Sequence, residues 1–433
     1  MPAPPLQPIV IWFGRLGDMI LLSALLDILY RRYGRGCHVL GAGPAAAQLY
    51  ATHAAVARVT CLHRYTVFLL DGSWWRLVRA LRASGDAPVY VCEYDPRKLG
   101  RVRRLLKWGG VDEARCLFIT RTACLGGPSP PVPDVGPAHR VDAPESLGGP
   151  SPPAPGVRPA HWVDAPAHSD TALPHAPQQA PAHWVDRLVC FARLTPPALA
   201  AADYPWVDST DGPSLPALGA PRLEVSAAAR ADCAQWIDAQ GWSARALVLV
   251  QPGNRRTMRG RQLRLSADDD KSWPIERWAA LLRLLHTHMP QAVIVLCGAP
   301  RESLLLGWIR AAAPLPAVAA AELPLPRLLA LCARAHSMIS VDTGPAHAAA
   351  ALSLPLVVMF GAHAQREWLP RSPTGSAVVG IGGPPYSTRL DQIAVESVFA
   401  AWCALPPRAA PGAGGAAPAG RALTATAAHA TAP

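Results

Sequence analysis

The stretch that decides the fold reads MISVDTGPAH over Met338–His347 and continues, after an alanine-rich run, with LVVMFG over Leu356–Gly361. It predicts a buried strand, a tight turn, the start of a helix and then a second strand. Pro345 suits the first helical turn, and Asp342 or Thr343 can cap it. The free N–H groups and the dipole of such a helix start favour a phosphate or diphosphate. An ordinary turn with a capping Asp is the alternative.

The composition indicates a soluble cytoplasmic protein with an anionic partner. The chain has 433 residues, enough for two domains, and a formal net charge of +11, which favours nucleic acid, phosphorylated lipid or a nucleotide-linked substrate. Ten cysteines are scattered singly, as expected for thiols in a reducing cytoplasm rather than for disulfides or a metal site. Met1–Pro8 has no basic region, and Ile9–Phe13 is too short for a signal or a membrane span.

Both halves of the chain alternate strand and helix patterns, which predicts parallel Rossmann-like sheets. The strand Ile9–Phe13 passes through the turn Gly14–Asp18 into a helix at Met19–Tyr33. Further strands are expected at Cys37–Leu40, Val59–Leu62, Val89–Cys92, Cys116–Ile119, Ala246–Gln251 and Ala292–Cys297. We therefore predict an α/β protein with two Rossmann-like halves facing across a cleft, at about residues 1–205 and 222–388, and an amphipathic helix at 389–405.

A proline-rich duplication interrupts the first half. The segment Leu125–Pro131 recurs at Leu147–Pro153, and the pattern PAH(R/W)VD occurs at Pro137–Asp142, Pro159–Asp164 and Pro181–Asp186. The repeats hold too few large apolar residues to form a core. We predict a mobile insertion at about 125–181, whose histidines are more simply explained by duplication than by metal binding, and a disordered tail at 406–433.

Seven short motifs in order give the chain a family resemblance. They are Gly14-x-x-Gly17-Asp18, Gln251-Pro252-Gly253, Lys271-Ser272-Trp273-Pro274-x-x-Arg277-Trp278, Gly298-Ala299-x-x-Glu302, Asp342-Thr343-Gly344-Pro345-x-His347-x-x-Ala350-Ala351, Phe360-Gly361 and Trp368-x-Pro370. This order resembles the ADP-heptose:lipopolysaccharide heptosyltransferases, glycosyltransferase family 9. The resemblance covers nearly the whole chain outside the insertion and the tail.

The resemblance implies a GT-B fold, with an acceptor-binding N-terminal domain, a nucleotide-sugar-binding C-terminal domain and a last helix that crosses back to the first. It also implies an enzyme that transfers heptose, with inversion, from ADP-heptose to the lipopolysaccharide inner core, on lipid A–Kdo or its heptosylated form. No cofactor or metal is implied, and Asp268–Asp270 is not accompanied by further metal ligands. A family-9 enzyme with another nucleotide-sugar or acceptor, or an inactive basic nucleotide- or lipid-binding protein, is the alternative. Nucleic acid is disfavoured because no recognition fold accompanies the cations.

The resemblance also assigns residues to the reaction. An inverting transfer needs a base to take the proton of the acceptor hydroxyl, and Asp18 occupies the family's position for it; a helix cap is the alternative. The diphosphate leaving group needs stabilisation, for which Lys271 and the helix start at Thr343 are placed, although Lys271 could be a solvated charge. The implied donor-binding residues are Ser266, Lys271, Glu302, Asp342, Thr343, Gly344 and His347. Glu302 could instead only begin a helix.

Six cations in the first half form a candidate acceptor or membrane surface, interleaved with Leu, Val and Trp. They are Arg97, Lys98, Arg101, Arg103, Arg104 and Lys107. Such a segment can contact acceptor phosphates or an anionic face of the inner membrane, although a merely solvated helix is the alternative. One departure from the family lies near the predicted donor site: His363 stands where a Thr is usual.

Overall fold

The computed structural model describes residues 5–62, 72–119, 183–202, 204, 219–254, 256–259, 262–264, 271–316 and 318–408. The predicted insertion at 125–181, Ser266, Asp268–Asp270 and the chain from residue 409 onward lie outside the described residues. Within the described helices, no segment combines the length and the apolar character needed to cross a membrane.

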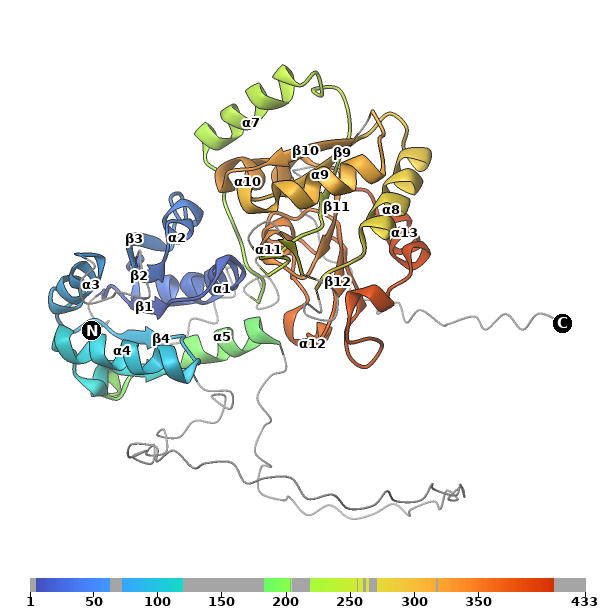
Figure 1. Cartoon of the computed structure of the whole chain (residues 1–433). Helices are drawn as coiled ribbons and strands as arrows, with labels where there is room; N and C mark the ends of the chain where they lie inside the picture. The colour runs from blue at the N-terminus through green and yellow to red at the C-terminus, as the bar shows by residue number, and fades with distance from the viewer. Residues whose placement is uncertain are drawn as a thin grey trace, which may run out of the picture. The chain divides into compact units, whose positions relative to one another are not determined.

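The first half forms a five-stranded parallel sheet in the order β3-β2-β1-β4-β5 (Figure 1). Its strands are β1 (Ile9–Trp12), β2 (Cys37–Ala42), β3 (Val56–Leu62), β4 (Val89–Val91) and β5 (Cys116–Phe118). Its helices are α1 (Leu16–Tyr33), α2 (Ala45–Leu49), α3 (Gly72–Arg82), α4 (Pro96–Gly109) and α5 (Trp184–Arg193), with 3-10 turns η1 (Glu113–Arg115) and η2 (Pro197–Leu199). The predicted strands of this half are confirmed.

The second half forms a six-stranded parallel sheet in the order β10-β9-β6-β11-β12-β13. Its strands are β6 (Leu247–Gln251), β9 (Val293–Gly298), β10 (Val318–Glu322), β11 (Ser337–Val341), β12 (Leu356–Phe360) and β13 (Val378–Gly382); β7 (Met258–Arg259) and β8 (Gln262–Leu263) form a separate hairpin. Its helices are α7 (Ala227–Ala239), α8 (Ile275–His288), α9 (Ser303–Ala312), α10 (Leu325–Arg334), α11 (Gly344–Ala351), α12 (Gln365–Trp368) and α13 (Val395–Cys403), with 3-10 turns η3 (Pro300–Glu302) and η4 (Leu390–Gln392).

The central strands are buried along their whole length. Every residue of β1, β6, β11 and β12 is buried, because helices of a doubly wound sheet cover both faces and favour continuous apolar runs. The largest buried cluster includes residues of both halves, and within it α1 packs against α11. The carboxyl ends of β1 and β11 lead directly into these two helices, so both helix starts lie where ligands of such sheets bind.

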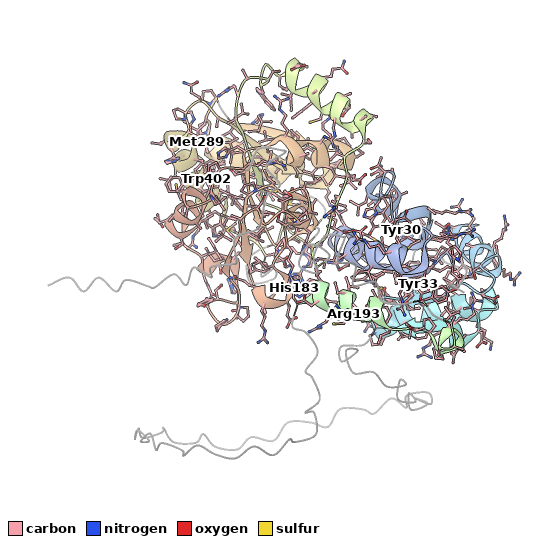
Figure 2. All side chains as sticks on the ribbon, turned by 180° about the vertical axis from the view of Figure 1, so that it is seen from behind. Tyr30, Tyr33, His183, Arg193, Met289 and Trp402 are labelled. Atoms are coloured by element: carbon pink, nitrogen blue, oxygen red, sulfur yellow. The ribbon has the colours of Figure 1, made fainter. Side chains whose placement is uncertain are left out.

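The last helix does not pack as predicted. The main partners of α13 are α8, β12 and β13 of the second half, whereas we predicted a helix that crosses back to the first. Figure 2 shows Trp402 of α13 beside Met289 at the end of α8, and both belong to one apolar cluster. The Trp402 indole Nε1 also donates a hydrogen bond to the hydroxyl of Ser337, at 2.8 Å. This helix therefore buries its apolar face on the sheet that precedes it in the chain.

The element that joins the halves is α5, whose first turn is the last copy of the PAH(R/W)VD repeat. Figure 2 labels His183 and Arg193 at its two ends. At the first end, the imidazole Nε2 of His183 lies 2.8 Å from the carbonyl oxygen of Leu369. Asp186 forms a bidentate pair with Arg371, at 2.5 and 2.8 Å. The ring centroids of Trp184 and Trp368 are 5.4 Å apart. Three side chains of this copy of the repeat therefore contact residues of the second half.

All nine cysteines of the described chain are free thiols, and most are buried. Burial raises the pKa of Cys116 and of Cys332 to about 12. Cys403, at the end of α13, is exposed.

Candidate active site

Asp18 lies in the first turn of α1, directly beyond the carboxyl end of β1. Its carboxylate Oδ2 accepts a hydrogen bond from the backbone N–H of Arg15 at 2.6 Å, so Asp18 does cap its own helix. Burial raises the pKa of Asp18, an effect that the Arg15 hydrogen bond and the charge of Lys98 oppose and that the charge of Asp342 reinforces. A carboxylate with a raised pKa is a better proton acceptor than an ordinary Asp, and the capping hydrogen bond uses only one of its two oxygens.

A second acid, which the sequence analysis missed, lies beside this helix start. Glu93 follows β4, the strand next to β1, and its side chain is 1% exposed. The ammonium of Lys98 lies 3.6 Å from Glu93 Oε2 and donates to the carbonyl oxygen of Phe13 at 3.2 Å. Lys98 therefore belongs to the edge of the sheet that carries Asp18. An acid directly after the predicted strand Val89–Cys92 was the available signal.

The starts of α1 and α11 touch each other through glycines. A Cβ on Gly344 would lie 3.0 Å from the Cβ of Leu16 and 3.1 Å from the backbone nitrogen of Gly17. A Cβ on Gly17 would in turn lie 3.3 Å from the imidazole Cδ2 of His347. These approaches leave little room for any side chain, which explains glycine at both positions and brings Asp18 near the second half.

The start of α11 lacks a side-chain cap in the structure. Thr343 is its N-cap residue, but no side-chain cap bond forms within the described chain; the Thr343 hydroxyl instead lies 3.4 Å from that of Ser340. Gly344 and Pro345 form the first positions of the helix. A helix start of this kind presents backbone N–H groups and a positive dipole end to an anion.

Lys271 and Asp342 form a largely buried ion pair beside the same helix start. The Lys271 ammonium lies 2.5 Å from Asp342 Oδ2 and 3.2 Å from the Asp342 carbonyl oxygen. The two side chains are only 12% and 7% exposed, respectively. The imidazole Nδ1 of His363 approaches the same carboxylate oxygen to 3.5 Å. The structure thus rules out Lys271 as a solvated surface charge and adds His363 to the group.

His347 and Glu302 are buried at two different places on this edge of the sheet. Burial lowers the pKa of His347 to about 4, so its imidazole is neutral near pH 7, and its Nδ1 has no hydrogen-bond partner among the described residues. Glu302 accepts a hydrogen bond from the Ala299 N–H at 2.7 Å and therefore does cap its own turn, η3. Its other carboxylate oxygen faces Gly253 after β6, where an added Cβ would lie at 2.7 Å.

The six predicted acceptor cations lie on two different parts of α4. Lys98 lies near Asp18, as described, whereas Arg103, Arg104 and Lys107 line a surface hollow of about 560 Å³ near the other end of α4. The hollow also includes Trp108, whose ring stacks on Trp75 of α3 at 5.5 Å and 6°. Arg97, Arg103, Arg104 and Lys107 are exposed, and Arg101 is partly exposed.

Comparisons with known proteins agree with this architecture. Residues 224–389 match the family model described as glycosyltransferase family 9 (heptosyltransferase), whereas no curated protein matches the chain. A family 9 glycosyl transferase from Veillonella parvula is similar, with 15% identity, 93% of this chain and 97% of that chain covered, and a TM-score of 0.60. ADP-heptose lps heptosyltransferase II of E. coli shows 16% identity, coverages of 92% and 98%, and a TM-score of 0.57. E. coli heptosyltransferase WaaC with ADP shows 15% identity, with 92% of this chain and 99% of that chain covered, and a TM-score of 0.53. At these identities the similarity establishes the fold, and the predicted GT-B architecture is confirmed.

Proposed function

We propose that this chain is a member of glycosyltransferase family 9 (heptosyltransferase), whose model matches residues 224–389, and that it moves a heptose from ADP-heptose to the inner core of lipopolysaccharide. The acceptor would be lipid A–Kdo or its heptosylated form. One observation supports this most strongly: the starts of α1 and α11 meet at Gly17 and Gly344, so a partly buried acid, Asp18, and a largely buried cation, Lys271, lie beside two adjoining helix starts, one in each half. An inverting transfer needs a base on one side of the anomeric carbon and a stabilised leaving group on the other.

Asp18 would act as the base. As the acceptor oxygen forms its bond to the anomeric carbon, its proton passes to the free carboxylate oxygen of Asp18. Lys98, which lies near both Asp18 and Glu93, would hold an anionic group of the acceptor close to that carboxylate. Arg97 and Arg101 lie on the same N-terminal part of α4 and would extend this acceptor surface.

The α11 start would hold the leaving group. The bond between the anomeric carbon and the diphosphate oxygen breaks with both electrons on ADP, whose added charge the backbone N–H of Gly344, the dipole of α11 and the Lys271 ammonium would stabilise. Asp342 and His347 would contact the sugar or diphosphate. Glu302 would bind the ribose hydroxyls, and Ser266 would bind a phosphate. The resemblance of the motifs supports these last roles.

The far end of α4 would face the cytoplasmic surface of the inner membrane. Trp75 is 46% exposed and stacks on Trp108, and Arg103, Arg104 and Lys107 surround the hollow beside them. Exposed indoles with neighbouring cations are suited to an anionic lipid surface. Vesicles containing an anionic phospholipid should sediment the protein in low salt, and Trp75→Ser with Lys107→Gln should abolish this.

The decisive experiment supplies the purified protein with ADP-heptose and lipopolysaccharide that lacks its inner-core heptose. A mass increase of one heptose on the acceptor, absent with Asp18→Asn, is expected. Transfer from a different nucleotide-sugar alone would replace the donor assignment. ADP binding without transfer to any tested acceptor would favour a nucleotide-binding protein instead.

A further inference from the structure

The carboxylate of Asp342 has two cationic or potentially cationic neighbours on the same oxygen. Lys271 Nζ and His363 Nδ1 approach Asp342 Oδ2 to 2.5 Å and 3.5 Å. Asp342 is 7% exposed, whereas the His363 side chain is 42% exposed. His363 therefore reaches this buried carboxylate from a more open position, beyond the carboxyl end of β12.

The ion pair creates a problem for the proposed donor site. Lys271 directs its ammonium at both the carboxylate and the carbonyl oxygen of Asp342. If the ammonium turns to a diphosphate, the Asp342 carboxylate loses its closest cation while it remains buried. A buried carboxylate that loses its partner is strongly destabilised, and this cost would oppose donor binding.

His363 lies where it can pair with the Asp342 carboxylate in place of Lys271. It follows Phe360 and Gly361 at the end of a fully buried strand, and its ring centroid lies 6.0 Å from that of Trp368. Trp368 in turn packs on Trp184 of α5, which is 3% exposed. The imidazole thus lies beside the Trp368 ring and faces Asp342 with Nδ1, which can donate a hydrogen bond in the tautomer that carries a proton there.

We propose that His363 is a positioning residue, which holds the Asp342 carboxylate through its Nδ1–H when Lys271 turns to the donor diphosphate. The proposal rests on the proposed function, because it requires that Lys271 serves a diphosphate. His363 does not touch the reacting atoms in this arrangement. Its contribution is to keep a buried acid paired while the cation changes partners.

The test compares two substitutions that differ in one donor group. His363→Asn keeps an N–H near the position of Nδ1, whereas His363→Leu removes it and keeps the bulk. In His363→Leu, ADP should bind roughly 10- to 100-fold more weakly, which corresponds to a hydrogen bond to a charged group. His363→Asn should bind ADP within a few-fold of the wild type. Calorimetry with ADP and thermal unfolding should be measured for each protein.

The role of Asp342 provides the second arm. In the Asp342→Asn background no buried charge is left behind, so His363→Leu should add little further loss of ADP binding. An equal loss in both backgrounds, or wild-type binding by His363→Leu, would overturn the proposal. If His363→Leu does not fold, His363→Ala takes its place with the same expected loss. A wild type that fails to bind ADP would instead refute the proposed donor site, so the two failures are distinguishable.

Discussion

The two helix starts that meet at Gly17 and Gly344 follow the same kind of strand but end differently. In α1, the Asp18 carboxylate accepts the N–H of Arg15 and caps the helix. In α11, the N-cap residue Thr343 forms no side-chain cap bond within the described chain. The first start thus carries its own anion, and the second is suited to an anion that arrives with a ligand.

This difference would let two similar helix starts take different parts in one reaction. A carboxylate at a helix start is partly stabilised by the helix dipole, yet burial keeps the pKa of Asp18 raised. On the other side, the Lys271 cation adds to a helix start without an acidic cap. We therefore expect proton acceptance at α1 and stabilisation of negative charge at α11.

The largest expected effect is the loss of the acid at α1. Asp18→Asn should lower turnover by roughly 10²- to 10⁴-fold, as expected for a lost general base. The Asn side-chain oxygen can still accept the Arg15 N–H, so thermal unfolding and ADP binding should stay near the wild type. Steady-state transfer rates measure the effect. Turnover within a few-fold of the wild type would reduce Asp18 to a cap and remove the contrast.

Loss of the cation at α11 should have the next largest effect. Lys271→Ala removes charge stabilisation that grows as the bond to ADP breaks, so the catalytic rate should fall by roughly 10²- to 10³-fold. ADP binding should weaken less than the rate. Rates and calorimetry on the same preparation separate the two quantities, and a loss confined to ADP binding would contradict a role in the transition state.

The glycine contact can be tested with a matched pair of alanines. Gly344→Ala places a Cβ 3.0 Å from Leu16, whereas Gly307→Ala, within α9, meets nothing within 4 Å. We expect Gly344→Ala to lower the free energy of unfolding by about 1–3 kcal/mol through overpacking and to weaken ADP binding. Gly307→Ala should raise stability by about 0.5–1 kcal/mol. Equal behaviour of the two variants would show that the helix starts tolerate separation.

The pH dependence of transfer should reflect the raised pKa of Asp18. The base must be deprotonated, so kcat/KM should fall as the pH drops through a pKa that lies above the usual value of 3.8. This fall of kcat/KM at low pH should be absent from the residual activity of Asp18→Asn. A profile of kcat/KM against pH for both proteins measures this, and an identical acidic limb in the two would assign the titration to another group.

The smallest effect is expected away from both helix starts, at the ion pair between α5 and the second half. Burial raises the pKa of Asp186, but the hydrogen bonds and charge of Arg371 outweigh this and lower it. The pair therefore adds stability above the ordinary Asp pKa and loses it as the pH falls through the lowered one. Asp186→Asn should cost about 0.2–1 kcal/mol near pH 7, because the pair is partly exposed. Denaturant unfolding at pH 7 and at low pH should show a difference that shrinks on acidification.

The sequence predicts the central strands well because strands buried on both faces are visible as apolar runs such as Leu356–Phe360. It misses β10 and β13, the two edge strands of the second sheet, and every residue of β13 is only partly buried. It also locates Asp18, Lys271 and Asp342, since each occupies a recognisable motif. It does not identify Glu93 or the His363–Asp342 contact, because these depend on which strands are neighbours and on how far a side chain reaches. It leaves Asp18 open as base or cap; the structure shows the cap, through one carboxylate oxygen, and the role as base stays a prediction.

The last helix and α5 show that a sequence pattern does not reveal which surface an element packs against. An amphipathic pattern at 389–405 indicates that one face will be buried but not which surface covers it, and α13 packs on its own half. Only the last copy of the PAH(R/W)VD pattern, at Pro181–Asp186, runs into a plausible helix in the sequence, and α5 confirms that helix, but the pattern does not show which surface the copy contacts. Its contacts become visible only in the structure, where the partners of His183, Trp184 and Asp186 lie 184 to 186 positions further along the chain.

The distribution of thiols has a practical consequence. Because burial raises the pKa of Cys116 and Cys332 to about 12, few of these side chains are thiolates at neutral pH, and thiolates are the species that react with maleimides. Cys403, by contrast, is exposed at the end of α13. Once Cys124, outside the described residues, and the partly exposed Cys61 and Cys190 are replaced by Ser, a fluorescent maleimide should attach preferentially at Cys403. The labelled protein would then carry a reporter on the second half, remote from both helix starts in the sequence.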